Sequence, residues 1–75
     1  MKTKYKYIEF KETNTQEAGK PVWHCTNRKS GAVLLRVIYY FAWRRYVASD
    51  TNLHAVFSAD CYRDIANFLE QLNQG

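Results

Sequence analysis

GAVLLRVIYYFAWRRY, residues 31–46, is the stretch that decides the fold of this chain. Read as a strand, it is apolar on both faces, because successive side chains of a strand point to opposite sides. Its side chains form two sets, Val33, Leu35, Val37 and Tyr39 on one face and Leu34, Arg36, Ile38 and Tyr40 on the other. A chain of 75 residues has little material to cover both sides of a sheet. We therefore expect one face to pack inside the protein and a second copy or a partner to cover the other.

Segments on both sides of this stretch predict further strands of one antiparallel sheet. Residues 4–11 are rich in aromatic and β-branched side chains, and residues 22–27 follow as a second strand. The central strand runs over 32–41, and residues 43–49 form the fourth strand. A short extended piece at 54–57 leads out of the sheet.

Polar and glycine-containing segments separate these strands. Residues 12–21 predict a loop, residues 27–31 a hairpin turn, and residues 50–52 a turn, while Ala42 sits at a tight reversal. If the 12–21 loop or the N-terminal strand folds over the second face of the central strand, that face needs no partner.

The C-terminal part of the chain predicts an amphipathic helix. Ser58 is a good N-cap, Asp60 lies in the first turn, and Asn73 ends the helix. Its apolar stripe has helical spacing and consists of Cys61, Ile65, Phe68, Leu69 and Leu72. We expect this helix to cover the face of the central strand that carries Val33, Val37 and Tyr39.

The predicted fold class is α+β. An antiparallel meander of four to five strands is followed by one C-terminal α-helix on one face of the sheet, and residues 1–75 form a single domain. Hydrophobic residues make up 47% of the chain and exclude a disordered polymer. Aromatic residues reach 16%, more than one core layer holds, so several should lie on a surface.

Charge is distributed unevenly along the chain. Residues 1–45 hold ten Lys and Arg against three Glu, a local charge of +7, whereas residues 46–75 hold one Arg against four acidic residues, a local charge of −3. The pattern predicts a basic sheet that attracts nucleic acid or an acidic protein surface; the alternative is that the lysines only keep a small domain soluble. No secretory signal and no apolar run of transmembrane length is visible, and two cysteines are too few for a disulfide scaffold. A cytoplasmic protein without a membrane role is expected.

Residues spread along most of the chain match one family pattern. They are Lys4, Tyr7, Ile8, Glu9, Phe10, Trp23, Asn27, Ser30, Leu34, Val37, Tyr39, Tyr40, Trp43, Arg44, Tyr46, Phe57, Cys61, Asp64, Ile65, Phe68, Leu69 and Leu72. In these residues the chain resembles a widespread group of small uncharacterised bacterial and phage proteins. It departs from the group at Leu35, where Gly is usual, and at Tyr39, where Trp is usual. The resemblance implies the α+β fold and a bacterial or mobile-element origin, and it implies no activity.

The sequence offers no constellation for catalysis, and we predict that the protein is not an enzyme. His24 and Cys25 are adjacent on a strand, so their side chains point to opposite faces. Cys61 lies on the apolar stripe of the helix and is expected to be a core residue; pairing of Cys61 with a histidine is possible only through folding. No metal-ligand spacing is present, so no catalytic residue, metal or cofactor is predicted.

Trp43, Arg44, Arg45 and Tyr46 form the sharpest chemical feature of the chain. Arginine beside aromatic side chains suits stacking on bases and contact with phosphates. The structural alternative is that Trp43 packs in the core and Arg44 pairs with Asp64. The full set of predicted binding residues is Leu34, Arg36, Ile38, Tyr40, Trp43, Arg44 and Arg45, extended by Lys4, Lys6, Arg28 and Lys29.

Two functions are consistent with these features. The first is a non-catalytic module that binds nucleic acid, or a nucleic-acid-handling protein complex, through a basic aromatic sheet face. By analogy with phage proteins of this size, such a module would inhibit a host defence complex. The alternative is a protein–protein module that forms a homodimer through an open sheet face or an edge strand, with no role in binding nucleic acid.

Overall fold

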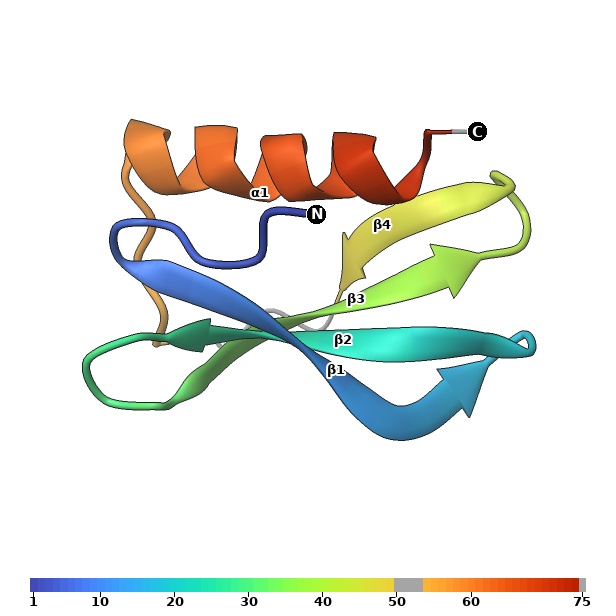
Figure 1. Cartoon of the computed structure of the whole chain (residues 1–75), viewed down its shortest axis with the longest axis horizontal. Helices are drawn as coiled ribbons and strands as arrows, with labels where there is room; N and C mark the ends of the chain where they lie inside the picture. Colours follow the sequence, from blue (N-terminus) through green and yellow to red (C-terminus); the bar gives the residue numbers. More distant parts are fainter. Residues whose placement is uncertain (50–53, 75) are drawn as a thin grey trace.

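Four antiparallel strands form one meander, and a single helix lies across one face of the sheet (Figure 1). The computed structural model describes residues 1–49 and 54–74. The strands pair in chain order and are β1 (Ile8–Glu17), β2 (Lys20–Asn27), β3 (Val33–Tyr40) and β4 (Arg45–Ser49). Helix α1 (Ala59–Leu72) follows. The predicted α+β meander with one C-terminal helix is therefore confirmed.

The β1–β2 hairpin differs from the loop predicted over residues 12–21. Strand β1 continues through polar residues to Glu17, and the turn consists of Ala18 and Gly19 alone, with φ angles of 53° and 74°. Two successive residues with positive φ are typical of the tight hairpin turns whose twist matches that of the strands. Pairing with β2 is irregular between Glu12 and Gln16, so β1 bends strongly (Figure 1). The polar composition concealed this strand because backbone pairing at both ends of the irregular stretch, together with the Thr13 hydroxyl, holds it to β2 without an apolar pattern.

The N-terminal residues reverse direction before β1 and do not belong to it. The Tyr5 N–H donates to the Ile8 carbonyl oxygen at 2.9 Å, and the Phe10 N–H donates to the Thr3 carbonyl oxygen at 2.8 Å. The strand predicted over residues 4–11 is therefore a tight reversal followed by the first part of β1. Tyr5, at this reversal, is buried.

The core lies between α1 and the sheet and is centred on Phe68. The Phe68 ring stacks on Phe10 with centroids 4.0 Å apart and meets the edge of Trp23 at 5.1 Å. As predicted, Cys61 and Ile65 are buried on the same helical stripe. The helix begins where expected, because the Ser58 hydroxyl accepts a hydrogen bond from the Cys61 N–H at 3.2 Å.

A bulge in β3 changes the predicted faces of that strand. Cys25 pairs with Leu35 but Thr26 pairs with Val33, so Leu34 is an extra residue that pushes its neighbours out of alternation. Val37 packs under the helix as predicted, whereas the same expectation for Val33 is wrong, since its side chain is exposed. Leu34 packs against the core instead of joining the opposite face.

The second face of the sheet is not an open apolar surface. Val22 and Ile38, which point away from the helix, are 1% and 9% exposed in the single chain. The expectation that a second copy or a partner must cover this face of the central strand is therefore wrong at Ile38. The bent end of β1 reaches this face: the Thr13 hydroxyl donates to the Val22 carbonyl oxygen at 2.8 Å, and Glu17 forms an ion pair with Arg36.

Two further boundaries differ from the prediction. The fourth strand begins at Arg45 rather than at residue 43, because residues 41–44 form the turn from β3. Residues 54–57 adopt no strand. The turn predicted at 50–52 lies outside the described residues.

Candidate functional site

The end of the β3–β4 hairpin exposes three aromatic side chains to solvent. We call residues 40–45 the hairpin tip. Phe41 is 73% exposed, Trp43 65% and Tyr40 43%, and the Tyr40 and Trp43 rings meet edge to face at 5.2 Å. Large exposed apolar side chains gathered on one element are typical of interaction sites. The alternative in which Trp43 packs in the core is therefore wrong.

The backbone of the tip accounts for this exposure. The Trp43 N–H donates to the Tyr40 carbonyl oxygen and the Arg44 N–H to the Phe41 carbonyl oxygen, each at 3.1 Å, so the turn closes on itself. Arg44 has a φ of 52°, in the left-handed region. A non-glycine residue there is strained by about 1 kcal/mol. The same left-handed backbone occurs at Ala18 in the β1–β2 turn, so at Arg44 it reflects the geometry of the β3–β4 turn.

Arg44 and Arg45 place two cations beside the aromatic rings. The Arg45 Nε donates to the Trp43 carbonyl oxygen at 3.4 Å. Arg44 lines a hollow beside the last turn of α1 together with Lys20, whose Nζ lies 5.1 Å from the centre of the Tyr39 ring. Asp64 lines a different hollow, with Lys2 and Tyr5, so the predicted Arg44–Asp64 pair does not form.

Lys20 is a member of this surface that the sequence did not single out. It is the first residue of β2, directly after the tight turn at Ala18 and Gly19. In an antiparallel meander that turn lies at the same end of the sheet as the β3–β4 turn (Figure 1). Had Ala18 and Gly19 been recognised in the sequence as a two-residue hairpin turn, Lys20 would have been placed at this end of the sheet.

A shallow groove of about 620 Å³ extends from the tip along the outer edge of β4. Trp43 and Arg45 lie at one end, and Ala48 and Leu69 line its length. The hairpin tip therefore offers aromatic rings, two arginines and an adjoining shallow groove.

The edge of β4 is held in place by the end of the helix. The Asn73 Oδ1 accepts from the Tyr46 N–H at 2.8 Å, and the Asn73 Nδ2 donates to the Tyr46 carbonyl oxygen at 3.2 Å. Gln71 binds the backbone of Lys2 in the same way, at 2.8 and 2.9 Å. These two carboxamides fix the helix, the N-terminal segment and the base of the hairpin tip relative to one another.

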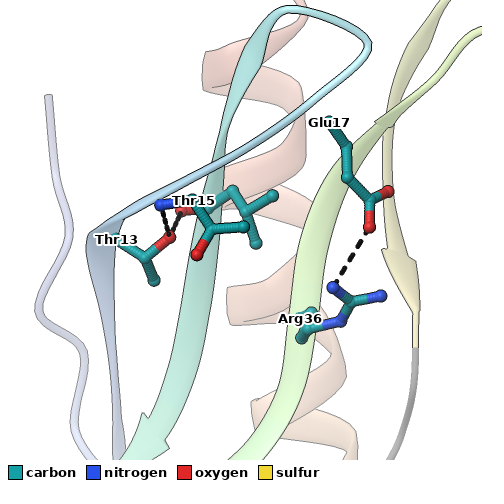
Figure 2. Close-up of polar contacts among 5 residues, drawn as sticks. Thr13, Thr15, Glu17 and Arg36 are labelled. Carbon is teal, nitrogen blue, oxygen red and sulfur yellow. Dashed lines mark hydrogen bonds and ion pairs between the residues drawn. The ribbon is translucent and has the colours of Figure 1, made fainter.

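Arg36 and Ile38 do not join the hairpin tip. The Arg36 Nη1 lies 3.2 Å from the Glu17 Oε1, on the side of the sheet that faces away from α1 (Figure 2). Ile38 is buried on that same side. With Leu34 in the core, three of the predicted binding residues therefore have structural roles.

The remaining predicted cations lie at the opposite end of the sheet. Lys6, Arg28 and Lys29 line a hollow of about 470 Å³ together with Tyr7 and Asn27. Lys4 is exposed beside them, where its backbone forms a bridge with Glu9. The basic face predicted as one surface is thus divided into two, separated by the length of β3, about 25 Å.

The two cysteines are buried core residues, and Cys61 lines a hollow that His54 also lines. Burial, with a smaller contribution from the nearby Cys61, raises the pKa of the Cys25 thiol to about 12. Both thiols are buried in the core. In residues 1–49 and 54–74, no group of three or more His, Cys, Asp or Glu side chains is placed to hold a metal ion. Within the same residues, no helix is long and apolar enough to cross a membrane.

Comparisons with known proteins add no assignment: no protein-family model, no curated protein and no solved structure matches this chain. The resemblance to small bacterial and phage proteins therefore stays a prediction. The candidate site rests on the geometry and charge of the hairpin tip.

Proposed function

We propose that this protein is a non-catalytic binding module that holds single-stranded nucleic acid on its hairpin tip. The observation that carries the proposal is the exposure of Phe41 and Trp43 beside Arg44 and Arg45. Aromatic rings at a loop end stack on bases that are not paired, and arginines beside them contact the phosphates. The proposal moves the binding surface from the sheet face, where Ile38 is buried, to the end of the sheet.

The charges around the tip suit a flexible anionic strand. Arg44, Arg45 and Lys20 lie at this end of the sheet and form no ion pair within the described residues. Neutralising up to three phosphates of a single strand gives a slope of about −2 in log K against log salt concentration. Affinity is therefore expected to fall roughly fifteenfold between 50 and 200 mM salt.

Tryptophan fluorescence tests the proposal on the intact chain. Trp43 is exposed, whereas Trp23 packs against Phe68, so a ligand on the tip quenches mainly Trp43. A titration with a 12-nucleotide single strand should show saturable, salt-dependent quenching. Trp43→Ala should weaken binding roughly fivefold to a hundredfold, measured by anisotropy of a labelled strand, because stacking on one base contributes about 1–3 kcal/mol.

Two control variants separate this site from general charge and hydrophobicity. Tyr62→Ala removes another exposed aromatic ring, at the start of α1, and Lys11→Gln removes an exposed cation from β1. Both should leave the affinity within about twofold. Neither side chain lies at the hairpin tip, and the loss of one distant surface charge changes the affinity little. If Tyr62→Ala weakens binding as much as Trp43→Ala, or if no binding occurs at 50 mM salt, the proposal is wrong.

A second candidate function is a protein–protein module, and the groove along β4 favours it. The groove adjoins the hairpin tip and follows the edge strand β4, where an added chain can pair only beyond Tyr46, because Asn73 already binds the backbone N–H and carbonyl of Tyr46. Its partners would be a second copy or an acidic surface of a nucleic-acid-handling complex, such as a host defence complex. Light scattering at micromolar concentration tests the homodimer: a mass of two chains that returns to one chain in Trp43→Ala supports it, and a monomer at every concentration excludes it.

A further inference from the structure

The hollow at the opposite end of the sheet has the composition of an anion site. It is lined by Lys6, Tyr7, Asn27, Arg28 and Lys29, so three of its five lining residues carry a positive charge. Within residues 1–49 and 54–74, none of the three cations forms an ion pair with a carboxylate. Among the described residues, no carboxylate lines this hollow, although Lys6 and Tyr7 also line the neighbouring hollow that contains Asp60 and Asp64. Three cations that line one hollow attract an anion from solution.

The protein holds the central members of this cluster in position. The Arg28 side-chain Nη1 donates to the Tyr5 carbonyl oxygen at 2.8 Å, and the Arg28 backbone N–H donates to the Tyr7 carbonyl oxygen at 3.0 Å. One end of the guanidinium is thereby anchored to the N-terminal reversal, and its other N–H groups remain available as donors.

The turn after β2 fixes the second side of the hollow. The Asn27 Oδ1 accepts from the N–H groups of Lys29 and Ser30 at 2.8 and 3.1 Å. This orientation leaves the Asn27 Nδ2 as a donor, so the nitrogen groups lining the hollow can donate to a ligand but not accept from it. A lining of this kind matches an oxyanion with several acceptor oxygens.

Tyr7 indicates what else the ligand carries. Its ring is 50% exposed, and the Lys6 Nζ lies 5.2 Å from the ring centre, which places a cation at one aromatic surface. The hollow, at about 470 Å³, has room for more than a phosphate group. A planar base stacked on Tyr7 with its phosphate among the cations would fill it.

We propose that Lys6, Arg28 and Lys29 bind the phosphate monoester of a nucleotide, with its base against Tyr7. The nucleotide is either free or the phosphorylated end of a nucleic acid strand. The site is separated from the hairpin tip by the length of β3, and the inference does not rest on the function proposed for the tip.

Nuclear magnetic resonance titrations of the full ¹⁵N-labelled chain test this site at constant ionic strength. The probes are adenosine monophosphate, adenosine, inorganic phosphate, and a five-nucleotide thymidine strand with and without a 5′ phosphate. Adenosine monophosphate should shift the amide signals of residues 6–7 and 27–29 saturably and bind more tightly than adenosine or phosphate alone. Equal affinity for adenosine and its monophosphate overturns the proposal. Amide shifts of similar size at all lysine residues of the chain also overturn it.

The two thymidine strands distinguish the sources of the phosphate. Tighter binding of the 5′-phosphorylated strand at these residues assigns the site to a strand end, and equal binding assigns it to free nucleotides. Lys6→Gln and Lys29→Gln should each weaken binding of adenosine monophosphate about tenfold, since each removes a charge-assisted hydrogen bond. Lys11→Gln, with the same loss of charge elsewhere on the surface, should leave the affinity unchanged, and an equal loss in this control contradicts the site. Trp43→Ala should have no effect here, which separates failure of this site from failure of the tip.

Discussion

Asn73 closes the outer edge of β4 by pairing both polar atoms of its carboxamide with the backbone N–H and carbonyl of Tyr46. A strand edge with unpaired backbone groups can pair with another chain. The residue that ends the helix therefore protects the part of the edge strand nearest the hairpin tip. This contact joins the residue that caps α1 to the second residue of β4, 27 positions away in the sequence.

Asn73→Ala should lower the free energy of unfolding by about 1–2 kcal/mol, because two hydrogen bonds of roughly 0.5–1.5 kcal/mol each are lost. Urea denaturation followed by circular dichroism measures the change. Gln74→Ala, one residue further on, is the matched control and should change stability by less than about 0.5 kcal/mol. Equal effects of the two variants would show that the Tyr46 contact does not stabilise the fold.

Tyr5→Phe should destabilise the protein by about 1–2 kcal/mol without disturbing the core. The Tyr5 hydroxyl donates to the Asn67 Oδ1 at 2.7 Å and accepts from the Gln71 Nε2 at 3.1 Å, while its ring meets the Phe10 edge at 5.8 Å. The variant keeps the ring and loses both hydrogen bonds. Hydrogen exchange at residues 3–5 should increase more than exchange in β2 and β3, and equal acceleration throughout the sheet would argue against a local anchoring role.

Arg44→Gly should raise stability and lower nucleic acid affinity at the same time. Glycine relieves the strain of the positive φ, a gain of up to about 1 kcal/mol, and the substitution removes a cation from the tip. Ala18→Gly is the matched control, because Ala18 also has a positive φ but lies in the β1–β2 turn and carries no charge. Both variants should unfold at higher urea concentration, and only Arg44→Gly should weaken strand binding. A loss of stability in both variants would exclude strain at these turns.

The protein should lose stability at alkaline pH, and Cys25 should account for part of the loss. Burial raises its pKa from 9.0 in an unfolded chain to about 12 in the folded protein. The folded state therefore keeps a proton that the unfolded state releases above pH 9, and stability falls progressively as pH rises from 9 to about 12. The pKa values of Tyr5 and Tyr46 are also raised by burial, which adds to the loss in the same direction.

Urea unfolding of the wild-type chain and of Cys25→Ala from pH 7 to 11.5 measures this contribution. The variant should be less stable at pH 7, because it leaves a small cavity, but its stability should decline less steeply above pH 9. Cys61→Ala, whose thiol lies on the helix, is the comparison. Parallel curves for Cys25→Ala and the wild-type chain would contradict the assignment.

The sequence predicted the elements that local chemistry controls. The helix from Ser58 to Asn73 follows from its cap and its apolar stripe, and the Asn27–Gly31 turn follows from residues that tolerate turn geometry. The exposed aromatic and basic residues at 43–45 were also identified. The sequence did not predict that these side chains are exposed, because a Trp in a strand is equally consistent with packing in the core.

The sequence-based predictions were wrong where backbone pairing between strands, rather than the pattern of apolar side chains, determines the structure. Polar residues 12–17 form a strand because a tight turn at Ala18 and Gly19 returns the chain beside them. The extra residue at Leu34 disrupts the face assignment of β3, and no local signal marks a bulge. Arg36 was expected in the binding face, but its partner Glu17 is brought to it only by the bend of β1.

By itself, the sequence of residues 31–46 and the helical stripe determined that a small antiparallel sheet packs under one helix, because periodic apolar side chains must be buried. The tertiary structure alone decided that the second face is covered within the chain at Val22 and Ile38. It also divided one basic segment into two surfaces at opposite ends of β3. Strand register and turn length control both outcomes, because they set where a side chain lies along the sheet, and neither is encoded in composition or charge.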